Sequence, residues 1–272
     1  MRLSILLVLV IGLFPAFAGA KDTNPLVGLQ TADQARAWEA VGRVNMAGIG
    51  FCTGALISPK LVLTAAHCMF DKRTGKRIAA EKIEFLAGWR DGRAAAQRNA
   101  KRVIINKNYE YDNAKRLDRV ASDIALIELD HPIKNARIVP FGWANRPSIG
   151  QQVQVVSYAK DRADAPSLEE TCRVLGKNPE VLVLSCTVNF GASGAPIFVV
   201  ENGVPRIASV VSAKAEWNNQ RVALGASLGR PLRDLITSME ASNGMFQQVE
   251  TVASTATNLT GSGQARAGFK NP

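Results

Sequence analysis

The chain has 272 residues and a formal net charge of +10 at pH 7. This length can bury a large core, either as one domain or as two small domains that share an interface. The basic residues are scattered, and no dense cationic run is interleaved with aromatic residues, so we expect no nucleic-acid partner and attribute the charge to solubility.

Residues 1–20 have the pattern of an export signal. Arg2 supplies the positive charge, residues 3–17 form a short apolar run broken by Pro15, and residues 18–20 fit the small-residue rule for cleavage. A cut two residues earlier fits the same rule, and an uncleaved anchor is an alternative that the shortness of the run disfavours. Later stretches are too short or too polar to span a bilayer. We therefore expect a secreted or periplasmic protein without stable membrane insertion after signal removal.

Residues 21–37 are polar and read as an irregular N-terminal arm. From residue 38 the chain consists of short β-rich runs separated by glycine, proline and charged turn signals. One set of runs occupies residues 38–135 and contains His67 and Asp123, and a second set occupies residues 136–242. Many short strands with few helical periods predict an all-β barrel or sandwich in each set.

One helix is predicted, near the end of the second set. It begins at about Pro231, a residue type favoured in the first helical turn. Its apolar residues recur on one face: Leu232, Leu235, Ile236 and Met239. Residues 243–272 are rich in Ser, Thr, Gly, Ala and Gln and poor in large apolar groups, which predicts a disordered tail.

Four cysteines are present, and export makes disulfides possible: Cys52, Cys68, Cys172 and Cys186. The sequence alone leaves three pairings open. A zinc site is the competing interpretation, but neither pair has the close spacing of a zinc knuckle. We expect no metal ion and no organic cofactor.

Three motifs supply a base, an acid and a nucleophile in the order His, Asp, Ser: LTAAHC with His67, SDIALIEL with Asp123, and GASGAP with Ser193. A serine hydroxyl is a weak nucleophile at neutral pH and needs a positioned base. His67 can be that base if a carboxylate holds its other ring nitrogen. Asp123 opens an apolar strand, where burying a carboxylate is costly unless it has such partners. A surface acid at the start of the strand is the alternative.

Ser193 lies between two glycines, just before an apolar strand. Glycine permits backbone conformations that other residues rarely adopt, so the N–H groups of Gly191 and Ser193 can converge into an oxyanion hole. A tight serine-containing turn is the simpler alternative. A lipase-type elbow does not fit, because Ala195 stands where that elbow needs glycine and the order of the three motifs is opposite.

On these motifs the chain resembles the trypsin-like serine proteases of the chymotrypsin fold, and its few cysteines make it most similar to the bacterial branch that includes glutamyl endopeptidases. The resemblance covers about residues 38–239 and is strongest in CTGALISPKLVLTAAHC, SDIALIEL and CTVNFGASGAPIF. It implies two six-stranded antiparallel β-barrels, an active site between them and a C-terminal helix. It also implies a Cys52–Cys68 bridge, which leaves Cys172 and Cys186 as the second pair.

Two departures from the family pattern bear on activity. Ala192 stands where the family usually has an aspartate, which in animal digestive members pairs with a newly cut N-terminal amine and switches the enzyme on. Ala195 replaces the second glycine of the motif. We expect an enzyme that needs signal removal but no such salt bridge. The absence of this aspartate also allows an alternative, a catalytically weak homologue that acts as a cationic binding protein.

The family register assigns substrate-binding positions. It implies Thr187 near the base of the primary pocket, Ser212 beside the catalytic aspartate, and Ala213 and Lys214 at the pocket entrance. Thr187 is not a carboxylate, which disfavours cleavage after Lys or Arg, and the histidine of glutamyl-specific pockets is absent from this region. We expect a small or apolar residue before the cut, with Lys214 leaving an acidic preference open. The expected protein is a monomeric serine endopeptidase that acts on proteins or peptides through an acyl-enzyme.

Overall fold

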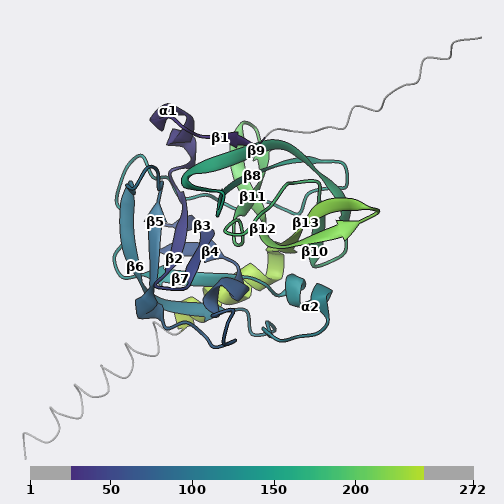
Figure 1. The fold of residues 1–272 in the computed structure, drawn as a ribbon, viewed down its shortest axis with the longest axis horizontal. Coiled ribbons are helices and arrows are strands. Elements are labelled where there is room, and N and C mark those ends of the chain that lie inside the picture. The colour runs from purple at the N-terminus through teal and green to yellow at the C-terminus, as the bar shows by residue number, and fades with distance from the viewer. Residues whose placement is uncertain (1–25, 242–272) are drawn as a thin grey trace, which may run out of the picture.

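The computed structural model describes residues 26–241, which form two β-barrels lying side by side (Figure 1). The predicted export signal, residues 21–25 of the predicted arm and the predicted tail lie outside the described residues. In the part of the chain that is described, no helix is both long and apolar enough to cross a membrane.

The N-terminal barrel is a closed antiparallel sheet with the strand order β2-β3-β4-β7-β6-β5. Its strands are β2 Val41–Met46, β3 Gly50–Ser58, β4 Leu61–Thr64, β5 Ile83–Ala87, β6 Ala96–Ile105 and β7 Ala125–Leu129. Alternation of side chains along a strand explains which residues enter the core. In β2, Val44 and Met46 are buried, while Arg43 and Asn45, which each precede one of them, are only half-buried.

The C-terminal barrel has the strand order β9-β10-β13-β12-β11-β8, and it closes because β8 also pairs with β9. Its strands are β8 Gln152–Ala159, β9 Arg162–Lys177, β10 Val181–Leu184, β11 Pro196–Glu201, β12 Val204–Trp217 and β13 Gln220–Ser227. The predicted fold of two six-stranded antiparallel barrels is confirmed.

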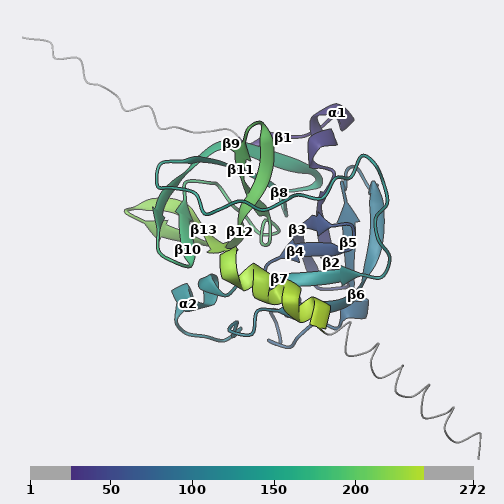
Figure 2. The same ribbon diagram turned by 180° about the vertical axis from the view of Figure 1, so that it is seen from behind.

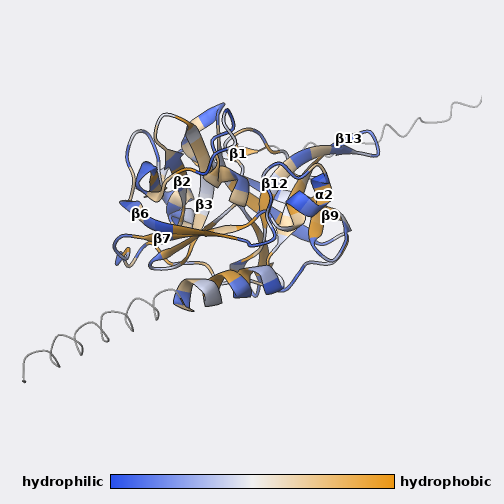
Figure 3. Ribbon diagram, turned by 90° about the horizontal axis from the view of Figure 1, so that it is seen from below, coloured by the Kyte–Doolittle hydropathy of each residue, from blue (hydrophilic) through white to orange (hydrophobic). Residues whose placement is uncertain are grey.

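The C-terminal helix contains residues 229–241 and lies over β7 on the outside of the N-terminal barrel (Figure 2). Leu232, Leu235 and Met239 are buried, as their spacing predicted, and Ile236 is partly buried against the same core. Arg102 on β6 donates a hydrogen bond to the Met239 carbonyl at 2.7 Å. All residues of β7 are buried, and Figure 3 shows this strand as largely hydrophobic.

The N-terminal arm is more ordered than the sequence suggested. A short strand, β1 Val27–Gly28, pairs with β9, and α1 Ala32–Ala35 is followed by a 3₁₀ turn, η1 Arg36–Trp38. Thr31 caps α1 in a reciprocal capping box with Gln34, which satisfies two backbone N–H groups at the helix start. The remaining short helices are η2 Ala66–Met69, η3 Ala80–Lys82 and α2 Arg116–Ala121.

Three aromatic side chains join the two barrels. Trp38 just before β2 lies 5.0 Å from Phe198 on β11, measured between ring centroids, and Phe141 in the connecting segment lies 4.7 Å from the same ring. All three belong to one continuous hydrophobic core that contains residues of both barrels. A packed core that the two barrels share resists their relative movement, so the barrels hold groups from the two halves of the chain at fixed positions.

Candidate active site

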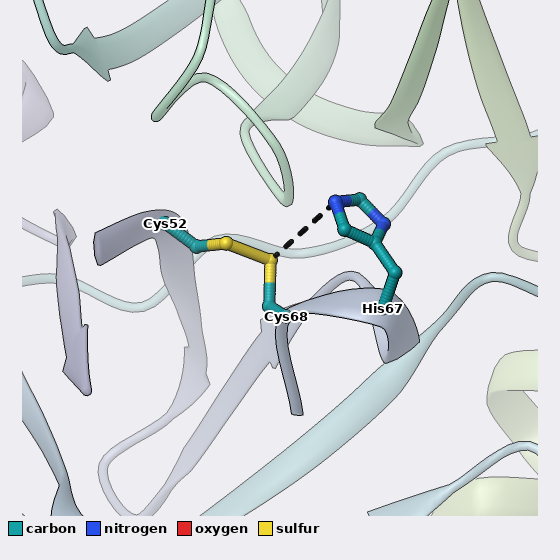
Figure 4. A group of neighbouring side chains, drawn as sticks. All are labelled: Cys52, His67 and Cys68. Atoms are coloured by element: carbon teal, nitrogen blue, oxygen red, sulfur yellow. Dashed lines mark hydrogen bonds between the residues drawn. A yellow bond between two sulfur atoms is a disulfide. The ribbon is translucent and has the colours of Figure 1, made fainter. Parts of the chain in front are cut away.

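His67 lies in the 3₁₀ turn η2, directly after β4, where a disulfide fixes the backbone. Cys52 on β3 is bonded to Cys68, the residue after the histidine, with an S–S distance of 2.04 Å. Figure 4 shows this disulfide beside the imidazole ring, whose Nε2 lies 3.9 Å from Cys68 Sγ. The ligating atoms of these three side chains lie within 4.8 Å of one another. Metal-binding cysteines must be thiolates, so in the bridged form this group does not offer a zinc site.

Asp123 is buried between α2 and β7 and has three hydrogen-bond donors. Its Oδ1 accepts the His67 backbone N–H at 2.8 Å, and its Oδ2 lies 2.6 Å from His67 Nδ1 and 2.5 Å from the Ser212 hydroxyl. These three hydrogen bonds offset the cost of burying the Asp123 carboxylate. Because an ionised carboxylate only accepts, Nδ1 carries a proton, and in the neutral imidazole Nε2 then keeps a free lone pair.

Ser193 and His67 line the same small cavity, of about 170 Å³, between the two barrels. Their side chains form no hydrogen bond with each other among the described residues. Such bonds are often long before substrate binds. The structure therefore pairs Asp123 with His67 by a direct hydrogen bond. It places Ser193 in the same cavity as His67, without a hydrogen bond between the two side chains.

The predicted oxyanion-hole donors are the N–H groups of Gly191 and Ser193. Among the described residues neither donates to any acceptor. Gly191 has a φ of 97°, in the region that favours glycine, and the carbonyl before it, that of Phe190, accepts the Lys160 N–H at 2.7 Å. The two polar groups of a peptide point in opposite directions, so this bond turns the Gly191 N–H away from Lys160.

The sequence model of the trypsin family matches residues 27–222. The chain belongs to the trypsin family. It is 26% identical over 152 residues to the glutamyl endopeptidase of Bacillus licheniformis, covering 55% of this chain and 46% of that protein. It is 33% identical over 101 residues to coagulation factor IX of Cavia porcellus, covering 35% and 31%. The chain thus spans less than half the length of these relatives.

A solved structure agrees with this assignment at the level of the fold. It is described as a Glu endopeptidase in complex with MPD, and it matches with a TM-score of 0.64 and 18% identity over 79% of this chain and 97% of the other. The predicted resemblance to trypsin-like serine proteases related to glutamyl endopeptidases is confirmed.

The structure of this trypsin-family chain places three of the four predicted substrate-binding residues together. Ser212, Ala213 and Lys214 line the cavity beside Ser193. Thr187 does not line it: its backbone N–H donates to both carboxylate oxygens of Glu169, at 2.8 and 3.1 Å. The role of Thr187 at the base of the pocket stays a prediction.

Sequence reasoning missed the side chains that complete the cavity. Two lysines approach the Phe190 ring, with Lys214 Nζ 4.4 Å and Lys72 Nζ 5.5 Å from its centroid. Phe190 directly precedes Gly191, one of the predicted oxyanion-hole residues, and this position in the motif could have marked it as a cavity residue. Lys72 comes from a charged loop of the other barrel and carries no comparable signal.

The second disulfide also has the pairing that the resemblance implied. Cys172 on β9 is bonded to Cys186, the residue before Thr187, with an S–S distance of 2.05 Å. Together with the hydrogen bonds from Thr187 to Glu169, this bridge fixes the start of the segment that continues to Ser193.

Glu169 gives the trypsin-family fold a testable pH dependence. The side chain is buried, and burial raises the pKa of its carboxyl from an ordinary 4.5 to about 7, against the opposing effects of the Thr187 N–H and the Arg162 charge. Between these two pH values the folded protein holds a proton that the unfolded chain releases. The free energy of unfolding therefore falls as the pH rises from about 4.5 to 7, by up to about 3 kcal/mol for this group.

Glu169→Gln removes this titration, so we expect urea unfolding curves of the variant to lose that part of the pH dependence. Glu170→Gln, at the exposed neighbouring position, is the matched control and is expected to follow the wild type. Parallel pH profiles for the wild type and Glu169→Gln would contradict this assignment.

Proposed function

We propose that this chain is a serine endopeptidase that hydrolyses peptide bonds through an acyl-enzyme intermediate. Ser193 is the nucleophile, His67 the general base and then acid, and Asp123 the group that orients the imidazole. The observation that carries the proposal is the pairing of buried Asp123 with partly buried His67, whose side chain shares one cavity with Ser193. Membership of the trypsin family supports the same reaction.

The geometry supports the following sequence of proton and bond changes. His67 Nε2 takes the hydroxyl proton as Ser193 Oγ bonds to the carbonyl carbon of the substrate, and the carbonyl oxygen becomes an anion held by the N–H groups of Gly191 and Ser193. The imidazolium then gives its proton to the departing amine nitrogen while the C–N bond breaks. Water, activated by the same imidazole, attacks the acyl-enzyme and restores Ser193.

Activity in this scheme needs no salt bridge at the residue before the nucleophile. Ala192 is fully buried, and its N–H donates to the Asn189 carbonyl at 3.0 Å. Among the described residues the N–H groups of Gly191 and Ser193 have no acceptor. This weighs against the alternative of a catalytically weak cationic binding protein, which was based on Ala192 and the basic charge.

We further propose that the protein is exported and acts as a monomer in a secreted or periplasmic location after removal of residues 1–20. Two disulfides support an oxidising compartment. The signal-like pattern at the N-terminus supports the same destination.

The positive charge of the cavity beside Ser193 supports a preference for substrates with an acidic residue before the scissile bond. Lys72 and Lys214 line it, and the other lining residues include no carboxylate: His67, Val188, Asn189, Phe190, Ser193, Val211, Ser212 and Ala213. A small or apolar side chain, the simpler expectation from sequence, gains nothing from these charges. A relative named glutamyl endopeptidase fits this preference.

Lys214→Gln is therefore expected to lower the ratio of kcat/KM for a glutamate substrate over its glutamine counterpart about tenfold, the value of one charge-assisted contact. Lys107→Gln, at an exposed lysine outside this cavity, is the control and is expected to leave the ratio unchanged. An unaltered ratio in Lys214→Gln would remove the support for an acidic preference.

The proposed reaction is tested by pre-steady-state hydrolysis of a chromogenic ester by oxidised residues 21–272. An acyl-enzyme whose breakdown is slower than its formation gives a burst of about one equivalent of leaving group per protein molecule. Ser193→Ala is expected to show no burst. Hydrolysis that persists unchanged in Ser193→Ala would contradict the proposal.

A further inference from the structure

Thr53 lies in the middle of β3, in the N-terminal barrel, but its hydrogen bonds reach the C-terminal barrel. The residue is fully buried. Its Oγ1 accepts the Tyr158 N–H at 3.0 Å and lies 2.9 Å from the Gly191 carbonyl oxygen. Its backbone N–H donates to the Ser193 carbonyl at 2.8 Å. One residue thus contacts both members of the proposed oxyanion hole.

The hydroxyl proton of Thr53 points to Gly191. A threonine hydroxyl has a single proton, and the alternative acceptor, the Tyr158 carbonyl, is farther away at 3.4 Å. The Thr53 hydroxyl therefore holds the Gly191 carbonyl, while the Lys160 N–H holds the Phe190 carbonyl. The peptide planes on both sides of Gly191 are fixed in this way, and with them the direction of its N–H.

The salt bridge that the family usually makes at the residue before the nucleophile is missing here, because Ala192 has no polar side chain. We infer that Thr53 is a positioning residue that keeps the oxyanion hole formed from the opposite barrel, in place of that salt bridge. The inference rests on the proposed function. It assigns to Thr53 no contact with the substrate.

The location of Thr53 on β3 also links the oxyanion loop, residues 189–194, to His67. The preceding residue, Cys52, is bridged to Cys68 next to His67. Adjacent residues of one strand therefore fix the general base on one side and the oxyanion loop on the other. This arrangement sets the separation between His67 and Ser193 without an activation step.

Thr53→Val keeps the shape of the side chain and removes the hydroxyl, so it tests this inference. We expect kcat to fall about 10- to 100-fold with KM changed less than about threefold. Deleting one oxyanion-hole donor lowers kcat by about 100- to 1,000-fold, and a Gly191 N–H that only points in the wrong direction should cost part of that. Affinity for a peptide boronate, whose anionic tetrahedral adduct puts a boron-bound oxygen in the oxyanion hole, should fall by a similar factor. Thr53→Ser restores the hydroxyl and should recover kcat to within about threefold of the wild type.

Ser209→Ala is the matched control for lost stability. Its hydroxyl is also fully buried and donates to a carbonyl, that of Ala226, at 2.7 Å, within the C-terminal barrel. We expect this variant to be less stable in thermal unfolding but to keep the wild-type kcat. If Thr53→Val does not fold, Thr53→Ala takes its place in the same comparison.

Three outcomes would overturn the inference. One is a folded Thr53→Val protein with the kcat and boronate affinity of the wild type, and another is an equal loss of kcat in Ser209→Ala. Both leave the proposed function intact. A wild-type protein that hydrolyses no ester or peptide would overturn the proposed function and this inference together, since no working oxyanion hole would exist for Thr53 to hold.

Discussion

Replacing Asp123 by asparagine is expected to lower kcat for peptide hydrolysis about 10,000-fold while leaving the protein folded. Both carboxylate oxygens accept hydrogen bonds, one from the His67 backbone N–H and the other from His67 Nδ1 and the Ser212 hydroxyl. An amide has only one oxygen. If that oxygen keeps the backbone N–H, the amide NH₂ faces Nδ1, which must then be unprotonated. The ring proton moves to Nε2, and His67 can no longer accept the proton of Ser193.

The effect of Asp123→Asn is checked by comparing kcat and thermal unfolding with those of Asp118→Asn. Asp118 is an exposed acid on the neighbouring helix α2, so its substitution removes the same charge without touching His67. The control should keep wild-type kcat. An Asp123→Asn protein that retains more than a tenth of wild-type kcat would contradict the assignment of Asp123 as the orienting acid.

Replacing Gly194 by alanine is expected to destabilise the protein by roughly 2–5 kcal/mol and to remove most of its activity. The residue has a φ of 78°, which costs an alanine about 1–2 kcal/mol. An added Cβ would also lie 2.2 Å from Thr64 Oγ1, 2.3 Å from the Thr53 carbonyl oxygen and 2.9 Å from the Ala65 nitrogen. Overpacking of this kind costs about 1–3 kcal/mol more. The loop that carries Ser193 must move away, and a 1 Å displacement of a reacting group costs about 100-fold in rate.

Gly203→Ala separates the two contributions. Gly203 has a φ of 79°, nearly the same value, but an added Cβ there would meet nothing within 4 Å. We expect this control to lose only the conformational part, about 1–2 kcal/mol in urea unfolding, and to keep full activity. Equal destabilisation by the two substitutions would show that Gly194 is not needed for close packing of the loop.

The sequence was enough to predict the parts of this molecule that depend on local pattern or on motifs. The alternating strands, the helix face with Leu232 and Leu235, and the disulfide pairings implied by the family resemblance all agree with the structure. The motif residues His67 and Asp123 also lie in direct contact, because the motif fixes each at the end of a strand that the barrel brings together.

Contacts between residues that are far apart in sequence and belong to no motif could not be predicted. Thr53 and Gly191 are separated by 138 positions, and no local pattern marks a threonine inside a strand as the partner of a loop carbonyl. The same holds for Lys72, which reaches the cavity from the N-terminal barrel, and for Glu169, which accepts hydrogen bonds from the Thr187 backbone N–H. The contacts of Thr53 and Lys72 depend on how the two closed barrels pack, and the contact of Glu169 depends on the folding of the C-terminal barrel itself.

The measurement that tests the central claim most directly is labelling of the oxidised, signal-free protein with a fluorophosphonate, followed by intact mass. The reagent reacts only with a serine that is activated by its base and whose oxyanion is stabilised. We predict rapid addition of one label per molecule at Ser193, with none in Ser193→Ala and no need for further cleavage within residues 21–37. A well-folded protein with both disulfides that remains unlabelled would contradict a preformed active site.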